Sequence, residues 1–264
     1  MSGQIDSRRI EHAKAFATLH VKGAPVVLFN IWDAGSALAT AKAGAKALAT
    51  GSWSVAAAHG FADGEALPFD MAIANLKRIV KTVDLPVSVD LESGYGASPE
   101  AVAETVTRAA AAGAIGFNLE DRIIGEKGLY STEDQVARIR AARDAANRIG
   151  IPLFINARND HFLNTDATTH DTALLDRALA RADAYAKAGA SGFFAPGLVD
   201  PALIGKLCTL APLPVNIMVF PATPPNKRLA ELGVARISYG PSPYRQAMES
   251  IEAAARAAFQ SLVT

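Results

Sequence analysis

The chain has 264 residues, half of them hydrophobic, with 26 Lys and Arg residues against 26 Asp and Glu residues. This composition excludes a disordered protein. The balanced charge, without a cluster of basic residues, argues against nucleic acid and polybasic membrane surfaces as partners. One cysteine, Cys208, excludes an intrachain disulfide and a Cys-rich metal site. No apolar run is long enough to span a membrane, and the N-terminus carries charges where a secretory signal is apolar. We therefore expect a soluble, cytoplasmic protein that acts on a small molecule.

Eight short apolar runs, bounded by Gly, Pro or polar residues, predict buried strands. In chain order they are 25–30, 47–51, 86–91, 114–120, 152–158, 191–196, 214–219 and 235–240. Between them lie Ala-rich segments with helical periodicity, such as those that begin at Pro99, Thr132 and Thr172. This alternation in a chain of this length predicts a single (β/α)8 barrel domain over residues 1–264. A doubly wound open sheet is the alternative.

The ends of the helical segments carry their own signals. Ser98 and Ser131 precede two of them in the position of an N-cap, and Asp33 is more readily explained as a cap than as a catalytic residue. Three glycines follow helical segments at the position of a C-terminal cap: Gly113, Gly150 and Gly189.

The last helical segment, from Ser242 onward, carries one broad apolar stripe that includes Met248, Ile251 and Phe259. Such a stripe either closes the barrel as its outermost helix or packs against another subunit. Periodicity does not distinguish between the two.

In a barrel of this type, catalytic residues lie where the strands end. The third run ends with Asp90 and Glu92, which strand alternation places on the same side, and the fourth ends with Glu120. Carboxylates that meet at one barrel mouth repel each other unless a proton or a cation lies between them. A site with oxygen donors alone favours Mg²⁺. Arg158, at the end of the fifth run, has a fork that can bind a substrate carboxylate.

A second anion site is expected after the second run, where residues 50–54 combine small side chains with free backbone N–H groups. Each candidate also has a structural interpretation. Glu120 and Arg122 can form a surface pair, and Arg158 can be clamped by Asp160 at the barrel rim. The convergence of several such residues on one face favours the functional interpretation.

Five segments together resemble the isocitrate lyase and phosphoenolpyruvate mutase superfamily over nearly the whole chain. Residues 90–96, Asp-Leu-Glu-Ser-Gly-Tyr-Gly, are similar to its D-x-D-x-G-Y-G metal motif, with Glu92 at the second acidic position. The remaining matches are Phe117–Asp121 with its I-x-I-E-D strand, Ala157–Asp160 with A-R-T-D, Gly51–Ser54 with the carboxylate-binding loop, and Gly60–Asp63 with G-x-x-D.

The resemblance implies a (β/α)8 barrel whose last helix is swapped between subunits in a dimer of dimers. It also implies Mg²⁺, or alternatively Mn²⁺, held directly by Asp90 and through water by Glu92 and Glu120. The substrate would be a small α-oxo or α-hydroxy carboxylate. The loop residues Gly51, Ser52 and Trp53 would bind its carboxylate, and Arg158 its other oxygens. Arg158 and Glu120 would be catalytic, with Asp63 as a polar support.

The implied reaction is cleavage of a C–C bond by a lyase or decarboxylase through an enolate intermediate. The loop over residues 121–131 departs from the family, because it lacks the catalytic Cys and His of the isocitrate lyases, and only Lys127 matches the mutase loop. This favours an oxaloacetate decarboxylase-like or uncharacterised branch. The alternatives are a P–C bond hydrolase or mutase acting on phosphonopyruvate-like substrates, and a non-catalytic barrel that binds an oxo acid.

Overall fold

The computed structural model describes residues 7–261, so residues 1–6 and 262–264 of the predicted domain lie outside the described part. Eight parallel strands form one sheet in the order β1-β8-β7-β6-β5-β4-β3-β2. The sheet curls until β1 and β2 meet at an isolated parallel bridge between Ile31 and Thr50. The predicted (β/α)8 barrel is therefore confirmed, nearly closed at this seam.

Each predicted strand is present and is shorter than the apolar run that predicted it. The strands are β1 Val26–Leu28, β2 Leu48–Ala49, β3 Val87–Asp90, β4 Gly116–Glu120, β5 Phe154–Arg158, β6 Gly192–Phe194, β7 Val215–Met218 and β8 Arg236–Ser238. Several apolar runs continue past the ladders with residues that also pack in the core, such as Ala47, Leu91 and Leu153.

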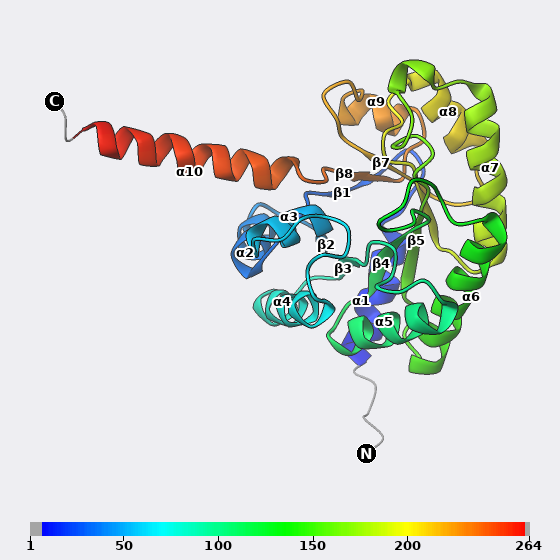
Figure 1. Ribbon diagram of the computed structural model, residues 1–264, viewed down its shortest axis with the longest axis horizontal. Helices are drawn as coiled ribbons and strands as arrows, with labels where there is room; N and C mark the ends of the chain where they lie inside the picture. Colours follow the sequence, from blue (N-terminus) through cyan, green and yellow to red (C-terminus); the bar gives the residue numbers. More distant parts are fainter. Residues whose placement is uncertain (1–6, 262–264) are drawn as a thin grey trace.

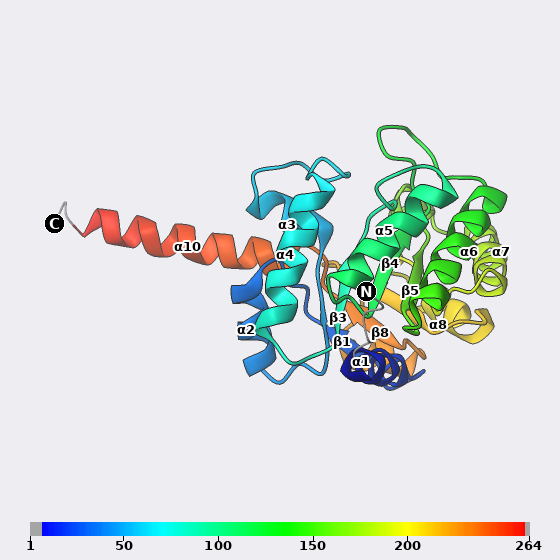
Figure 2. The same cartoon turned by 90° about the horizontal axis from the view of Figure 1, so that it is seen from below.

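The helices lie outside the barrel, as Figures 1 and 2 show. They are α1 Ser7–Thr18, α2 Ala34–Lys42, α3 Ser52–Ala58, α4 Phe69–Thr82, α5 Pro99–Ala111, α6 Thr132–Ile149, α7 Thr172–Lys187, α8 Pro201–Leu210, α9 Asn226–Glu231 and α10 Ser242–Gln260, with a 3₁₀ turn at Ala167–Thr169. Among the described residues, no helix is both long and apolar enough to cross a bilayer.

The predicted helix caps are confirmed. The side chains of Ser98 and Ser131 accept hydrogen bonds from backbone N–H groups in the first turns of α5 and α6. Asp33 caps α2 in a reciprocal arrangement with Ser36, as its structural interpretation predicted. Gly150 ends α6 with a φ of 76°, in the left-handed region that a residue with a side chain avoids. These caps fix where each helix begins and ends, and so where each loop leaves the barrel.

Polar side chains fill much of the barrel interior. The amide of Asn156 in β5 donates to the side-chain oxygens of Asn118 in β4 (2.9 Å) and Asn216 in β7 (3.1 Å). Asn216 donates to Ser238 in β8 (3.1 Å), and the buried Arg236 donates to Asn118 (3.3 Å). Because buried polar groups are costly unless they are paired, this network holds the strands beneath the barrel mouth in one arrangement.

Helix α10 does not cover the barrel from which it starts. Figures 1 and 2 show it running away from the other helices in both views, and Pro243 is its one buried residue in the described part. The side chains of Ile251 and Phe259 are 60% and 71% exposed. Of the two positions considered for this helix, closure of its own barrel is therefore wrong.

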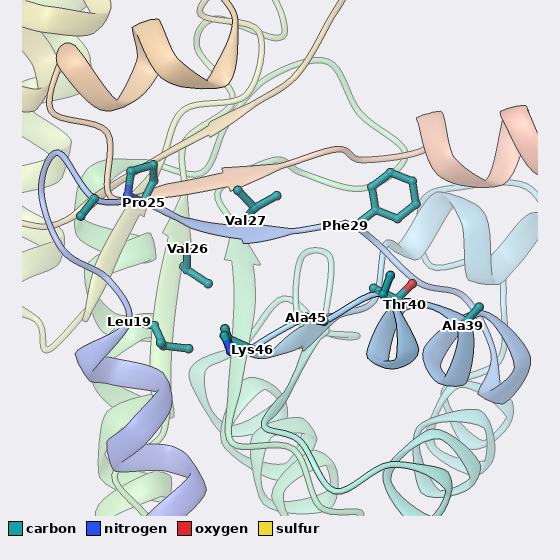
Figure 3. A pocket seen from close by; sticks show the side chains of 12 residues that line it. Leu19, Pro25, Val26, Val27, Phe29, Ala39, Thr40, Ala45 and Lys46 are labelled. Carbon is teal, nitrogen blue, oxygen red and sulfur yellow. The ribbon is translucent and has the colours of Figure 1, made fainter.

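The displaced helix leaves one flank of the barrel uncovered. A groove of about 700 Å³ runs between β1 and α2; Figure 3 shows Val27 of β1 and, in the segment after the strand, Phe29 on one side, with Ala39 and Thr40 of α2 on the other. Val27 and Phe29 are 43% and 41% exposed. Their outward side chains are exposed because no helix in the described part of the chain covers them.

Candidate functional site

Asp90 is the last residue of β3 and is held by the loop that follows β2. Its Oδ2 accepts hydrogen bonds from the backbone N–H of Ser52 (3.2 Å) and from the Ser52 hydroxyl (3.0 Å). Its own backbone N–H donates to the Thr50 hydroxyl (2.9 Å). The carboxylate is therefore fixed at the barrel mouth before any ligand binds.

Two N–H groups of the predicted carboxylate-binding loop already donate hydrogen bonds within the protein. The Gly51 N–H donates to the Ile31 carbonyl (3.2 Å), and the Ser52 N–H donates to Asp90. Trp53 lies in the first turn of α3, where backbone N–H groups lack a partner within the helix. Of the three loop residues predicted to bind a substrate carboxylate, Trp53 keeps its N–H available in this arrangement.

Glu92 lies beside Asp90, but not for the reason predicted, which was the alternation of side chains along a strand. Strand β3 ends at Asp90, and Glu92 has a φ of 50°, so the period-2 argument does not extend to it. Its Oε2 accepts the backbone N–H groups of Gly64 (2.9 Å) and Glu65 (2.7 Å). Burial, and after it the charge of the Asp90 carboxylate, raise the pKa of Glu92 to about 7 against the effect of those hydrogen bonds. The two acids therefore repel each other across a small cavity of about 20 Å³ that both line.

Glu120, Arg158 and Asp160 form a buried ion-pair cluster across β4 and β5. Glu120 lies directly opposite Arg158 in the parallel ladder, and Arg158 Nη1 is 2.7 Å from Glu120 Oε2. Arg158 also grips Asp160 through Nε (2.6 Å) and Nη2 (2.8 Å). The structural clamp by Asp160 is thus present, and Glu120 pairs with Arg158 rather than with Arg122. Burial raises the pKa of Glu120 while the Arg158 charge opposes that rise.

These side chains meet at a cavity of about 240 Å³ in the barrel mouth. Six of the eight predicted site residues line it: Gly51, Ser52, Trp53, Asp63, Asp90 and Arg158. Asp63 lies 3.5 Å from the Ser52 hydroxyl, and partial burial and the Asp90 charge both raise its pKa. Glu92 and Glu120 do not line this cavity; Glu92 lines the smaller one, and Glu120 supports Arg158.

Two asparagines that sequence reasoning missed as site residues also line the cavity. Asn30 accepts the N–H groups of Tyr239 and Gly240 (both 2.9 Å) and donates to the Thr50 carbonyl (3.1 Å), which joins β8 to the loop after β2. Asn118 accepts two donors at its oxygen, so its amide N–H₂ is left for the cavity. Asn30 ends its apolar run, which was a usable signal, whereas Asn118 lies inside the fourth run and carried none.

The remaining cavity residues come from strands and loops on the other side of the barrel mouth. They are Leu163, Phe194, Met218, Phe220, Ser238, Gly240, Pro241 and Arg245. Four of them are large apolar side chains, which no sequence pattern separates from ordinary core residues. Arg245 enters from α10, with Cζ 4.6 Å from the centre of the Trp53 ring.

The loop after β4 borders this site but is anchored outside the barrel. The buried carboxylate of Asp121 accepts hydrogen bonds from Asn159 (2.6 Å), the Asp160 N–H (3.0 Å) and Tyr185 (2.8 Å). The loop closes on itself at a bridge between Arg122 and Leu129. Lys127, the candidate mutase residue, lines a separate cavity beside α7.

The acidic residues at the barrel mouth fit a metal ion that keeps part of its water shell. Within residues 7–261, no three His, Cys, Asp or Glu side chains lie together as a ready set of direct ligands. The Asp90 charge nevertheless raises the pKa of Glu92, and the charges of Asp90 and Glu92 both raise the pKa of Glu120, so the three acids form one negative cluster that a cation would neutralise. The residues fit a hydrated Mg²⁺, which keeps several waters and takes few carboxylates directly.

Comparison with known proteins gives consistent results. A family model described as phosphoenolpyruvate phosphomutase matches residues 16–259. The chain is 33% identical to 2-methylisocitrate lyase of Escherichia coli (strain K12) over 221 residues, which is 80% of this chain and 71% of the relative.

Two solved structures extend the comparison. A protein of Burkholderia cenocepacia J2315, described as a candidate phosphonomutase, is 54% identical with a TM-score of 0.93, over 95% of this chain and 99% of that one. A phosphonopyruvate hydrolase, solved in complex with oxalate and Mg²⁺, has the same fold with a TM-score of 0.81 at 21% identity. That match covers 95% of this chain and 88% of the hydrolase.

Proposed function

The chain belongs to the phosphoenolpyruvate phosphomutase family, within the isocitrate lyase and phosphoenolpyruvate mutase superfamily, and on this premise we propose a specific activity for it. It is a Mg²⁺-dependent lyase or decarboxylase that cleaves a C–C bond in a small α-oxo or α-hydroxy carboxylate through an enolate. The observation that carries the proposal is the meeting of Asp90, Arg158 and the loop before α3 at one cavity. The fit of the acidic residues to a hydrated cation and the oxalate bound by a protein of the same fold support it.

Each residue has a role in this proposal. Asp90 would hold the metal directly, and Glu92 and Glu120 would hold it through water. When bound, Mg²⁺ supplies positive charge beside the oxygen on which the enolate develops. Arg158 uses three of its five N–H groups on Asp160 and Glu120, which leaves two for the substrate oxygens. The Trp53 N–H binds the substrate carboxylate. The side-chain N–H₂ of Asn118 donates a hydrogen bond to the substrate from the barrel interior.

The loop over residues 121–131 lacks the catalytic Cys and His of the isocitrate lyases. This favours a reaction that needs no proton donor from that loop. No Cys or His lines the described cavity. Loss of CO₂ from an oxo acid leaves an enolate that can take its proton from water. This supports decarboxylation, or a related C–C cleavage, over the chemistry of the isocitrate lyases.

A substrate panel tests this function. Purified protein should release an oxo acid from at least one of oxaloacetate, methylisocitrate and dimethylmalate, and EDTA should abolish the release until Mg²⁺ is restored. Phosphate release from phosphonopyruvate would favour P–C chemistry instead, to which the name of the Burkholderia relative lends support. Oxalate binding without any turnover would point to the non-catalytic barrel.

The uncovered groove and the projecting helix together support a proposal for assembly. The groove beside β1 is lined mainly by apolar residues and, within residues 7–261, no helix covers it, while α10 carries the exposed apolar residues Ile251 and Phe259. A second copy of the chain would cover both surfaces if each α10 packed in the groove of its partner. We propose this exchange, within a dimer of dimers.

Light scattering during size exclusion should therefore give a mass that is a multiple of 27.6 kDa. Ile251→Glu combined with Phe259→Glu should reduce the mass toward the monomer, because two charges would be buried in an apolar groove. Gln246→Glu with Ala253→Glu adds the same charge on the opposite face of α10 and should leave the mass unchanged. A monomeric unmodified protein would contradict the assembly.

A further inference from the structure

One arginine lies inside the barrel without an acidic partner. Arg236 is the first residue of β8 and is 1% exposed. The buried Arg158 and Arg181 are each paired with a carboxylate. Within residues 7–261, by contrast, no acid pairs with Arg236, and its Nε and Nη1 have no hydrogen-bond partner. A buried charge without a partner is costly, so its presence in the core needs a physical reason.

Arg236 keeps its charge in this environment. Burial lowers the pKa of Arg236 to about 9, and the charge of the Asp90 carboxylate opposes that fall. The guanidinium is therefore protonated at neutral pH. His20 gives it no counter-charge, since burial and, after it, the Arg236 charge lower the pKa of that imidazole to about 3. Among the described residues, Asp90 at the barrel mouth is thus the acid whose charge stabilises that of Arg236.

Asn118 connects Arg236 to the substrate cavity. Arg236 does not line that cavity, but its Nη2 donates to the Asn118 side-chain oxygen (3.3 Å). Asn156 donates to the same oxygen (2.9 Å). An amide whose oxygen accepts two donors presents its N–H₂ group to the other side, here the cavity that Asn118 lines. A donor that carries a full charge also polarises the amide, which makes that N–H₂ group a stronger donor.

A structural role alone does not account for a charge at this position. An apolar side chain of similar length would fill the same space in the barrel and would avoid the cost of removing a guanidinium from water. Arg236 lies beneath a site in which, under the proposed function, negative charge develops on the substrate. The charge has a purpose there that an apolar residue cannot serve.

We propose that Arg236 is a positioning residue for the reaction: it holds the Asn118 amide toward the substrate and strengthens the Asn118 hydrogen bond as negative charge develops on the substrate oxygen. This inference rests on the proposed function and adds a residue that acts in it without touching the substrate. The effect of Arg236 should therefore be larger on a ligand that resembles the enolate than on the oxo acid itself.

Binding of two acids to the Mg²⁺-supplemented protein tests this role without requiring turnover. Oxalate is a planar dianion that resembles the enolate of pyruvate, whereas pyruvate carries one negative charge less. Calorimetry gives the Kd of each, and the ratio of the pyruvate Kd to the oxalate Kd measures how strongly the site favours the added charge. Arg236→Met should lower this ratio about tenfold. Arg236→Lys keeps the charge and should hold the ratio within about threefold of the native value.

Three further measurements identify the cause of the change. Arg140→Met removes an exposed arginine from α6 and should change the ratio by less than about twofold, because solvent screens its charge. Mg²⁺ affinity should not fall in Arg236→Met, since the lost charge repels the metal. Thermal melts without Mg²⁺ should show no loss of stability, and Arg236→Gln, neutral but polar, replaces the methionine variant if that variant does not fold.

The route through Asn118 is tested by a double-mutant cycle. In Asn118→Ala, the further loss of the ratio on adding Arg236→Met should be about threefold or less, because the amide that carries the effect is gone. A loss of about tenfold in both backgrounds would show that Arg236 acts independently of Asn118, and it would overturn the proposed role.

The role of Arg236 and the proposed function can fail separately. If Arg236→Met leaves both acids unchanged, or weakens them equally, Arg236 has no part in stabilising the added charge and the proposed function still stands. A fall in Mg²⁺ affinity would mark Arg236 as a support of the metal site and would also overturn its proposed role. Failure of the native protein to bind either acid would overturn the proposed function, and the role of Arg236 with it.

Discussion

Asp90→Ala should abolish Mg²⁺ binding and lower kcat/KM on the order of a thousandfold or more. Asp90 is the carboxylate shared by the substrate cavity and the small cavity with Glu92. Its hydrogen bonds to Ser52 and Thr50 aim it at the barrel mouth, so no neighbouring acid can take its position without moving the loop before α3.

The same substitution should leave the fold intact. Asp90 raises the pKa of Glu92, so its removal relieves a repulsion between two acids. Calorimetric titration with Mg²⁺, the substrate assay and a thermal melt would be compared for Asp90→Ala and for Asp176→Ala, which removes an exposed carboxylate from α7. An Asp90→Ala enzyme that still turns over would refute the assignment of the metal site.

Arg158→Gln should lower kcat/KM by about a hundredfold to a thousandfold, and it should also destabilise the protein. The guanidinium neutralises Glu120 and Asp160, whose side chains are 4% and 0% exposed, so its loss leaves two buried carboxylates without a cation. Breaking such a pair costs about 3–5 kcal/mol of unfolding free energy. Arg158→Lys keeps the charge but loses the fork, so its activity and stability should fall between those of the native protein and Arg158→Gln.

The stability loss in Arg158→Gln should depend on pH. Without the opposing charge, the pKa of Glu120 rises further above its value in the unfolded chain, so the folded state holds a proton that the unfolded state releases. Stability should then fall as pH increases from roughly 5 to 8. Urea denaturation in EDTA at both values measures this, with Arg140→Gln on the exposed face of α6 as the control. Equal losses at the two pH values would show that Glu120 is not the group left unpaired.

The predicted site residues that the structure brings together share one property, which is their position at the end of a parallel strand or in the loop after it. Asp90 and Arg158 were predicted by this rule, and Asn30 could have been, because it ends an apolar run; Asn118 lies inside β4, where the rule does not apply. Glu92 was placed correctly beside Asp90 for an incorrect reason, since a left-handed turn and not strand alternation brings it there. Backbone conformation after a strand end is set by contacts with other loops, here with residues 64 and 65.

By itself, the sequence determined the order of strands and helices, the caps, and the strand-end acids and arginine, because these depend on short-range patterns and on the rule that parallel strands end at one face. The tertiary structure decided which hydrogen-bond donors are already used within the protein, such as the Ser52 N–H and three N–H groups of Arg158. It also decided which apolar residues line the cavity at the barrel mouth, and that α10 extends away from its own barrel. These features depend on contacts between residues far apart in the chain, and an apolar stripe or a polar side chain has the same local pattern whichever partner it meets.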